Sequence, residues 1–152
     1  MPAKKLKEFL DKNKVKYLSI VHSPAYSAME IAEASHVPGK DLAKTVIVNI
    51  DNVMSMVVLP APLKIDLSKL KSVVGANKAE LASEHAFASK FPDCEVGAMP
   101  PFGNLYNMPV YVDDDLAKDE EIAFNSGTHS EVIKLKYKDF YKLVKPKVVN
   151  FT

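Results

Sequence analysis

The stretch AKTVIVNIDNVMSMVVLP, residues 43–60, contains two apolar runs rich in β-branched residues, separated by a short polar turn. The first run, AKTVIVNID, covers residues 43–51, and the second, VMSMVVLP, covers residues 53–60. Nearly continuous apolar runs of this length are typical of strands whose two faces are both covered. The pattern therefore predicts a β-hairpin deep in a sheet.

Patterns on both sides of this hairpin predict further helices and strands. Ser27 and Glu30 have the spacing of a capping box, and Asp66 and Gly75 bracket a helical stripe of apolar residues. Helices are predicted around residues 6–10 and over 27–36, 67–75, 78–91 and 138–146, and strands over 15–22, 109–115, 121–127 and 131–137. This order predicts a mixed α/β fold for residues 1–152, about one domain in length, with a largely non-parallel sheet and helices packed on it.

The composition is that of a globular domain that needs no disulfide to fold. The chain has 152 residues, 47% of them hydrophobic, so it can bury a core unaided. A single cysteine, Cys94, excludes an internal disulfide and suits a reducing compartment. No apolar run approaches the ~20 residues of a membrane span, and the basic N-terminus lacks the apolar stretch of a secretory signal. We therefore expect a cytoplasmic protein that makes no contact with membranes.

The charges are balanced overall but unevenly placed. The formal net charge of +1 argues against a general nucleic-acid coat protein, which is usually strongly basic. Lysines nevertheless crowd residues 4–16 and 134–147, while residues 113–121, DDDLAKDEE, are acidic. A local basic pole is able to contact a few phosphates. The alternative is that these are ordinary solvated helix faces, and charge alone favours that interpretation.

The segment EVGAMPPFGN, residues 95–104, does not fit any regular element. Two adjacent prolines cannot continue a helix or a central strand, and Gly97 and Gly103 bracket them. Two of the five glycines of the chain fall in this segment. It predicts a stiff, exposed kink.

Three further places carry residues able to do chemistry. Lys44, followed by Thr45, begins a strand; its ammonium either snorkels to water at the sheet rim or points into a cleft and binds an anionic oxygen. Gly127, Thr128 and His129 form a tight turn between two strands. A histidine in such a turn either positions a substrate and exchanges protons or is an ordinary hairpin residue.

The third place is the end of the first strand, where His22, Tyr26 and Ser27 either line a cleft or cap the core. Cys94 precedes the kink, but nothing nearby predicts a lowered thiol pKa, so we expect a buried cysteine and not a nucleophile. No C-x-x-C or H-E-x-x-H spacing occurs, so no metal site is predicted.

Four of these segments occur in the order found in a known family. HSPAYSAMEIAEA, DLAKTVIV, GAMPPFG and GTHSEVIKL resemble the freestanding aminoacyl-tRNA deacylases of the YbaK type. These are related to the editing domain inserted in bacterial prolyl-tRNA synthetases. The resemblance extends from about residue 15 to residue 143. It implies a single compact mixed α/β domain with a central, mostly antiparallel sheet flanked by helices. As activity, it implies hydrolysis of the ester that joins a wrong amino acid to the 3′ end of a tRNA.

The resemblance also implies a mechanism with no metal, cofactor or protein nucleophile. A water attacks the ester, helped by a terminal ribose hydroxyl and by the backbone of a G-x-x-x-P loop. That loop falls on Gly97, Ala98, Met99, Pro100 and Pro101. Its amides would stabilise the tetrahedral oxyanion, while the prolines fix φ and keep the donors in place.

Side-chain roles follow from the same resemblance. Lys44 would hold the phosphate of the terminal nucleotide or help neutralise the oxyanion, next to Thr45. Gly127 would leave room for the aminoacyl group, and Thr128 and His129 would bound its pocket. His22, Tyr26 and Ser27 would line the entrance or the adenine pocket.

The expected partner is the 3′ acceptor end of an aminoacylated tRNA, with prolyl-tRNA synthetase as a candidate second partner. The expected substrate is alanine on the tRNA for proline, with cysteine and other small residues left open. Two alternatives remain: a tRNA- or synthetase-binding regulatory module that has the fold without catalysis, and an interaction domain that uses the lysine-rich terminal helices.

Overall fold

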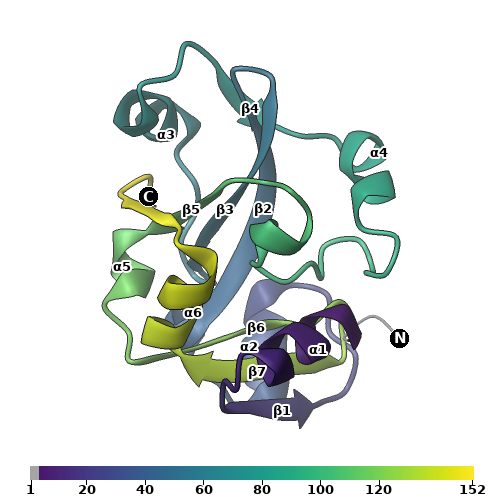
Figure 1. Ribbon diagram of the computed structural model, residues 1–152. Helices are drawn as coiled ribbons and strands as arrows, with labels where there is room; N and C mark the ends of the chain where they lie inside the picture. The colour runs from purple at the N-terminus through teal and green to yellow at the C-terminus, as the bar shows by residue number, and fades with distance from the viewer. Residues whose placement is uncertain (1–3) are drawn as a thin grey trace.

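The predicted hairpin lies at the centre of the sheet in the computed structural model, which describes residues 4–152 (Figure 1). Strands β2 (Leu42–Ile50) and β3 (Val53–Pro60) pair antiparallel from Ala43 opposite Pro60 to Ile50 opposite Val53. The two turn residues, Asp51 and Asn52, have φ values of 48° and 68°. A two-residue hairpin turn with both φ angles positive matches the strand twist, and Asp and Asn tolerate this conformation. The hairpin prediction is confirmed.

Six more strands extend the hairpin into one mixed sheet in the order β1-β7-β6-β2-β3-β5-β8, with β4 pairing beside β2. Their bounds are β1 (Tyr17–Val21), β4 (Ala79–Leu81), β5 (Val110–Asp113), β6 (Glu121–Asn125), β7 (Glu131–Lys136) and β8 (Lys147–Val149). The β1–β7, β6–β7, β2–β3 and β2–β4 pairs are antiparallel, and the β2–β6, β3–β5 and β5–β8 pairs are parallel. The expected mixed α/β fold with a mostly antiparallel sheet is confirmed.

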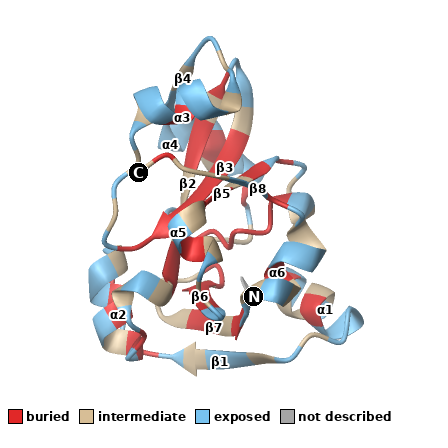
Figure 2. Cartoon of the chain, turned by 90° about the vertical axis from the view of Figure 1, so that its left-hand side faces the viewer, coloured by how far each residue is buried: buried red, intermediate tan, exposed pale blue. Residues whose placement is uncertain are grey.

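Helices cover both faces of this sheet. They are α1 (Lys4–Lys12), α2 (Ala28–Ser35), α3 (Leu67–Val74), α4 (Glu84–Phe87), α5 (Asp114–Ala117) and α6 (Tyr137–Val144). The largest apolar cluster takes side chains from α1, α4, α5 and α6, whereas α2 and α3 each supply a separate cluster. The central strands are accordingly buried and β1 is largely exposed (Figure 2). No helix within residues 4–152 is both long and apolar enough to cross a bilayer.

Two helices begin and end where local sequence predicts. The Ser27 side chain accepts the Glu30 N–H at the start of α2, and the Asp66 side chain accepts the Lys69 N–H at the start of α3. Gly75 ends α3 in the left-handed conformation, with φ +69°. These caps depend on residues three positions apart, which is why the sequence alone reveals them.

The helix predicted over residues 78–91 is wrong for its first part, residues 78–83, and only residues 84–90 are helical, as α4 and a 3-10 turn. The Asp51 carboxylate accepts the backbone N–H groups of Asn77 and Lys78, which brings the following residues to the edge of β2 as strand β4. Ser83 then caps the short helix α4 by accepting the Ala86 N–H. A tertiary hydrogen bond therefore overrides the local helical pattern.

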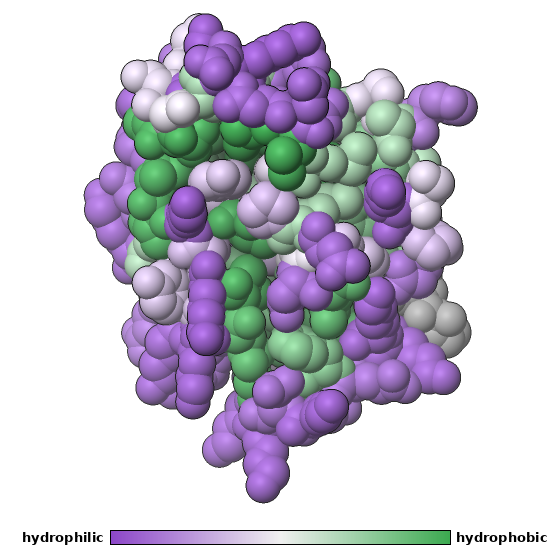
Figure 3. Space-filling view, turned by 45° about the horizontal axis from the view of Figure 1, so that its top comes forward, coloured by the Kyte–Doolittle hydropathy of each residue, from purple (hydrophilic) through white to green (hydrophobic). Residues whose placement is uncertain are grey.

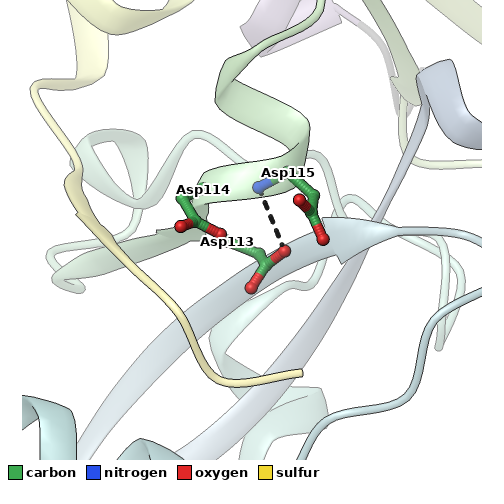
Figure 4. A group of neighbouring side chains, drawn as sticks. All are labelled: Asp113, Asp114 and Asp115. Carbon is green, nitrogen blue, oxygen red and sulfur yellow. Dashed lines mark hydrogen bonds between the residues drawn. The ribbon is translucent and has the colours of Figure 1, made fainter.

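The acidic run at residues 113–115 has a structural role. Asp113 ends β5, and its carboxylate accepts the Asp115 N–H at the start of α5 (Figure 4). Its other oxygen accepts the Phe151 N–H and the Thr152 hydroxyl, both at 3.3 Å. Phe151 is fully buried in the cluster on α3. Asp113 therefore joins the sheet to the C-terminal segment, and the strand predicted over 109–115 ends two residues early.

The kink at residues 95–104 is exposed at its two ends and buried between them. Residues 95–97 are exposed, but residues 98–103 are buried, so the expectation of an exposed kink is wrong for most of it. Phe102 packs against the rings of Phe9, Phe124 and Phe140, with centroids 6.1, 5.3 and 5.5 Å away. The aromatic core thus holds the loop at its carboxyl end.

Gly103 completes this anchor, because a Cβ atom there would lie 2.4 Å from the Met108 carbonyl oxygen. On the face shown in Figure 3, apolar side chains gather between hydrophilic ones.

Glu131, the first residue of β7, ties three elements together. Its carboxylate accepts a hydrogen bond from Lys7 of α1 at 2.8 Å, one from Ser19 of β1, and one from Ser126 at the end of β6 at 3.0 Å. Burial alone would raise the pKa of Glu131, but these donors outweigh it and the pKa is lowered. The ionised carboxylate therefore stabilises the fold.

We predict that Glu131→Gln lowers the free energy of unfolding by about 1–2 kcal/mol at pH 7, since charge-assisted hydrogen bonds at a partly exposed site are lost. A lowered folded-state pKa gives stability that is present above the ordinary carboxyl pKa and is lost as the pH falls through the folded-state value. Urea unfolding should therefore show the difference from wild type shrinking below about pH 4.

The matched control is Glu33→Gln on α2, because Glu33 is exposed and makes no ion pair within residues 4–152. Its stability should stay within about 0.5 kcal/mol of wild type. Equal stability of wild type and the Glu131 variant at pH 7 would show that the network contributes nothing.

Candidate active site

Three segments far apart in the chain meet at one end of the sheet. The Glu95 N–H donates to the Gly127 carbonyl at 2.7 Å, and the Glu95 carboxylate accepts the His129 N–H at 2.9 Å. The Ala25 N–H donates to the His129 carbonyl at 3.1 Å. The loop at residues 95–99, the turn at residues 126–130 and the segment at residues 22–27 are therefore held together by backbone contacts.

His129 lies at the centre of this arrangement. Its Nε2 atom is 2.9 Å from the Val96 carbonyl oxygen, and because a carbonyl only accepts, Nε2 carries a hydrogen. Its Nδ1 atom is buried and has no hydrogen-bond partner within residues 4–152. The exposed ring of Tyr26 packs on the imidazole with centroids 4.9 Å apart. The imidazole is therefore fixed in orientation with one nitrogen unused.

His22, like His129, has one ring nitrogen near a backbone carbonyl and one buried nitrogen without a partner within residues 4–152, but the two nitrogens have exchanged roles. Its Nδ1 is 2.7 Å from the Ser23 carbonyl oxygen, while its Nε2 is buried without a partner among the described residues. The His22 N–H donates to the Ser130 carbonyl at 2.8 Å, so this histidine sits beside the turn. Ser27, by contrast, is occupied as the cap of α2.

Two amides of the loop lack a strong acceptor within residues 4–152, whereas the Ala98 amide, which was expected to serve as a donor, already has one. The Ala98 N–H donates to the Glu95 carbonyl at 3.1 Å, so it is engaged within the loop. The Gly97 N–H faces only the Met99 sulfur at 3.3 Å, a weak acceptor, and the Met99 N–H makes no hydrogen bond within residues 4–152. Gly97 has φ +87°, which residues with side chains rarely adopt.

Lys44 lies where β2 and β6 separate. Within the described chain these strands pair only at Leu42 with Ala123 and Ala43 with Phe124, and Lys44 follows directly. Its Nζ donates to the Ala61 carbonyl at 3.0 Å. Burial, and then the nearby charge of Lys64, lower the pKa of the Lys44 ammonium.

Strand alternation places Lys44 and the loop on different sides of β2. Lys44 shares a face with Val46, which packs in the cluster of α3, whereas Ala43 and Ile47 share the cluster of Met99 on the other face. Thr45 lies on the same face as Ala43 by this alternation. The hydrogen bonds of residues 4–152 do not join Lys44 to the loop.

The turn itself carries two hydroxyls. Thr128 Oγ1 lies 3.4 Å from Ser130 Oγ, and Gly127 has φ +115°. Cys94, just before the loop, is unsuited to act as a nucleophile, because burial raises the pKa of its thiol to about 11.

Glu95 was missed by the sequence analysis, although it bonds both Gly127 and His129. A glutamate in an irregular segment is ordinarily solvated, so composition gives no sign of such a role. The only hint was its position two residues before a glycine in the kink.

Comparisons with known proteins place this geometry in context. The family model described as the aminoacyl-tRNA editing domain matches residues 22–143. The multifunctional Ser/Thr-tRNA deacylase ProXp-y of Escherichia coli K12 is 35% identical over 97 residues, 63% of this chain and 58% of that protein. The prolyl-tRNA editing protein ProX of Acetoanaerobium sticklandii is 28% identical over 153 residues, 90% of this chain and 86% of the relative.

Solved structures show the same fold at low identity. A protein described only as hypothetical has a TM-score of 0.86 at 18% identity, with 97% of this chain and 99% of that chain covered. A proposed trans-editing enzyme for prolyl-tRNA synthetase has a TM-score of 0.82 at 20% identity, with 99% of this chain and 96% of that chain covered. Because the family model covers most of the chain, including the loop and the turn, the chain belongs to the aminoacyl-tRNA editing domain family.

Proposed function

We propose that this chain is a deacylase that acts in trans and hydrolyses the ester of mischarged aminoacyl-tRNA. Membership of the editing family and the names of both relatives support this activity. One observation carries the proposal: the loop of Gly97 is clamped against the turn of His129, leaving two loop amides and one imidazole nitrogen without strong partners.

The free amides suit the chemistry of ester hydrolysis. Attack of water on the ester carbonyl produces a tetrahedral oxyanion, which fixed N–H donors stabilise better than mobile ones. The Gly97 N–H can leave the Met99 sulfur, a weak acceptor, and donate to this oxygen instead. The Met99 N–H has no acceptor within residues 4–152 and can donate to the oxygen directly. Loss of one such donor typically raises the barrier by about 3 kcal/mol.

Lys44 has an electrostatic role in this proposal. Its partly buried ammonium lies at the opening between β2 and β6 and is held by one carbonyl only. A desolvated ammonium attracts an anion more strongly than one in bulk water. We assign it the phosphate of the terminal nucleotide, because it approaches from the side of β2 opposite to Met99.

For the amino acid, the polar character of the turn favours serine or threonine over alanine. His129 Nδ1 is buried without a partner within residues 4–152, and the neighbouring turn residues Thr128 and Ser130 carry hydroxyls that bond each other. A substrate hydroxyl would give His129 Nδ1 a partner, whereas alanine would leave that nitrogen unpaired. The Ser/Thr specificity in the name of the E. coli relative agrees with this choice.

The direct test is release of amino acid from tRNAs charged with alanine, cysteine, serine, threonine or proline. We predict release of serine or threonine by wild type, and a loss of about 100-fold or more for Gly97→Ala, since a left-handed glycine there positions a donor. The matched control is Gly75→Ala, which has φ +69° and open space around it, and should be fully active.

Both glycine variants should lose about 1 kcal/mol of stability, so folding alone does not separate them. If no charged tRNA is hydrolysed while tRNA still binds, the chain is a binding module. Full activity of the Gly97 variant would remove the loop from the mechanism.

A second prediction concerns the ammonium group of Lys44. Lys44→Ala should reduce deacylation to near the uncatalysed rate with the fold intact, because the anion loses its counter-charge. Lys71→Ala is the control: Lys71 is exposed on α3 and its removal should leave turnover unchanged. Circular dichroism checks the fold, and unchanged turnover in the Lys44 variant would exclude its role.

A further inference from the structure

A lysine-lined groove lies at the opposite end of the β1–β7 ribbon from the candidate active site. It has a volume of about 580 Å³ and is formed by residues 13–18, Glu121, the end of β7 and one side of α6. Its wall contains six lysines against two carboxylates, Glu121 and Asp139. The six are Lys14, Lys16, Lys134, Lys136, Lys138 and Lys142. We call this site the lysine groove.

Within the part of the chain that the structure describes, five of these six ammonium groups are free to bind an anion. Among residues 4–152 only Lys134 of the six makes an ion pair, with Glu121 at 3.8 Å. Lys14, Lys16, Lys136, Lys138 and Lys142 are all exposed. Like charges held around one concave surface repel each other, and an anion bound between them relieves that repulsion. Ordinary solvated helix faces do not explain why lysines from three segments (residues 13–18, the end of β7 and α6) converge on one groove.

The position of the groove relates it to the candidate active site. β7 begins next to the turn of His129 and ends at Lys136, and β1 runs beside it in the opposite direction (Figure 1). Leu135 follows His129 by six residues, which corresponds to at most about 20 Å. A nucleic-acid strand carries one phosphate per ~3.4 Å of helix axis, so this distance spans up to about six nucleotides.

We propose that the lysine groove binds the phosphate backbone of the acceptor stem of the tRNA whose 3′ ester enters the site. This inference rests on the proposed deacylase function for the identity of the RNA. The groove's concave shape fits a rod-like polyanion, and its distance from His129 fits a duplex that begins a few nucleotides before the ester. The near-neutral net charge of the chain is consistent with contact to only a few phosphates.

The test compares two triple variants. The groove variant is Lys16→Gln, Lys138→Gln, Lys142→Gln, and the control variant is Lys71→Gln, Lys78→Gln, Lys147→Gln. Lys142 and Lys71 each lie in the last turn of a helix, and all six positions are exposed, so the two variants lose the same charge from similar places.

Binding of uncharged tRNA is measured by fluorescence anisotropy over a range of salt concentrations. The groove variant should bind about 10- to 100-fold more weakly, and its slope of log K against log salt should be smaller by about 2–3. The control variant should match wild type. Equal losses in both variants, or unchanged affinity and slope in the groove variant, would overturn the proposal.

A second probe separates this inference from the proposed function. An amino acid esterified to adenosine reaches the site but is too short to reach the groove. The groove variant should hydrolyse this ester at the wild-type rate, while its KM for the charged tRNA rises about tenfold or more. If wild type hydrolyses neither ester, the deacylase proposal fails, and the anisotropy data still decide whether the groove binds RNA.

Discussion

The double hydrogen bond of Glu95 is the constraint on which the candidate site depends. Its N–H and its carboxylate bind opposite ends of one turn, at Gly127 and His129. The first of these bonds fixes the separation of loop and turn, and the second fixes the orientation of the turn. Because His129 in turn contacts the Val96 carbonyl through Nε2, loop and turn hold each other. An oxyanion site needs this kind of rigidity, since donors that must reorganise lose most of their effect.

Other parts of the structure anchor both the loop at residues 95–99 and the turn at residues 126–130, which Glu95 joins. The loop is anchored behind Met99 by Phe102, which is fully buried among aromatic rings from α1, β6 and α6. The turn is anchored behind Ser130 by Glu131, whose ionised carboxylate joins α1 and β1 to the end of β6. Apolar packing therefore anchors the loop, and charge-assisted hydrogen bonds anchor the turn. Because only the hydrogen bonds depend on an ionised carboxylate, the anchoring of the turn should weaken at low pH while that of the loop does not.

Local patterns predicted those parts of the fold whose causes are local. The β2–β3 hairpin and the caps at Ser27 and Asp66 depend on neighbouring residues, and all were found from sequence. Strand β4 was predicted as helix because its cause is Asp51, 26 residues away from Asn77. The burial of the kink was missed for the same reason. In the candidate site, the family resemblance predicted Gly97 and His129, which the structure brings together, but not Glu95, whose hydrogen bonds form only once the chain has folded.

The central claim is that loop amides receive the charge of the reacting ester oxygen. The most direct test is a crystal structure with a non-hydrolysable analogue in which serine is joined to 3′-amino-adenosine through an amide. The account predicts the analogue's carbonyl oxygen about 2.7–3.2 Å from the Gly97 or Met99 nitrogen. A carbonyl oxygen bound elsewhere, with the Gly97 N–H still against the Met99 sulfur, would contradict it.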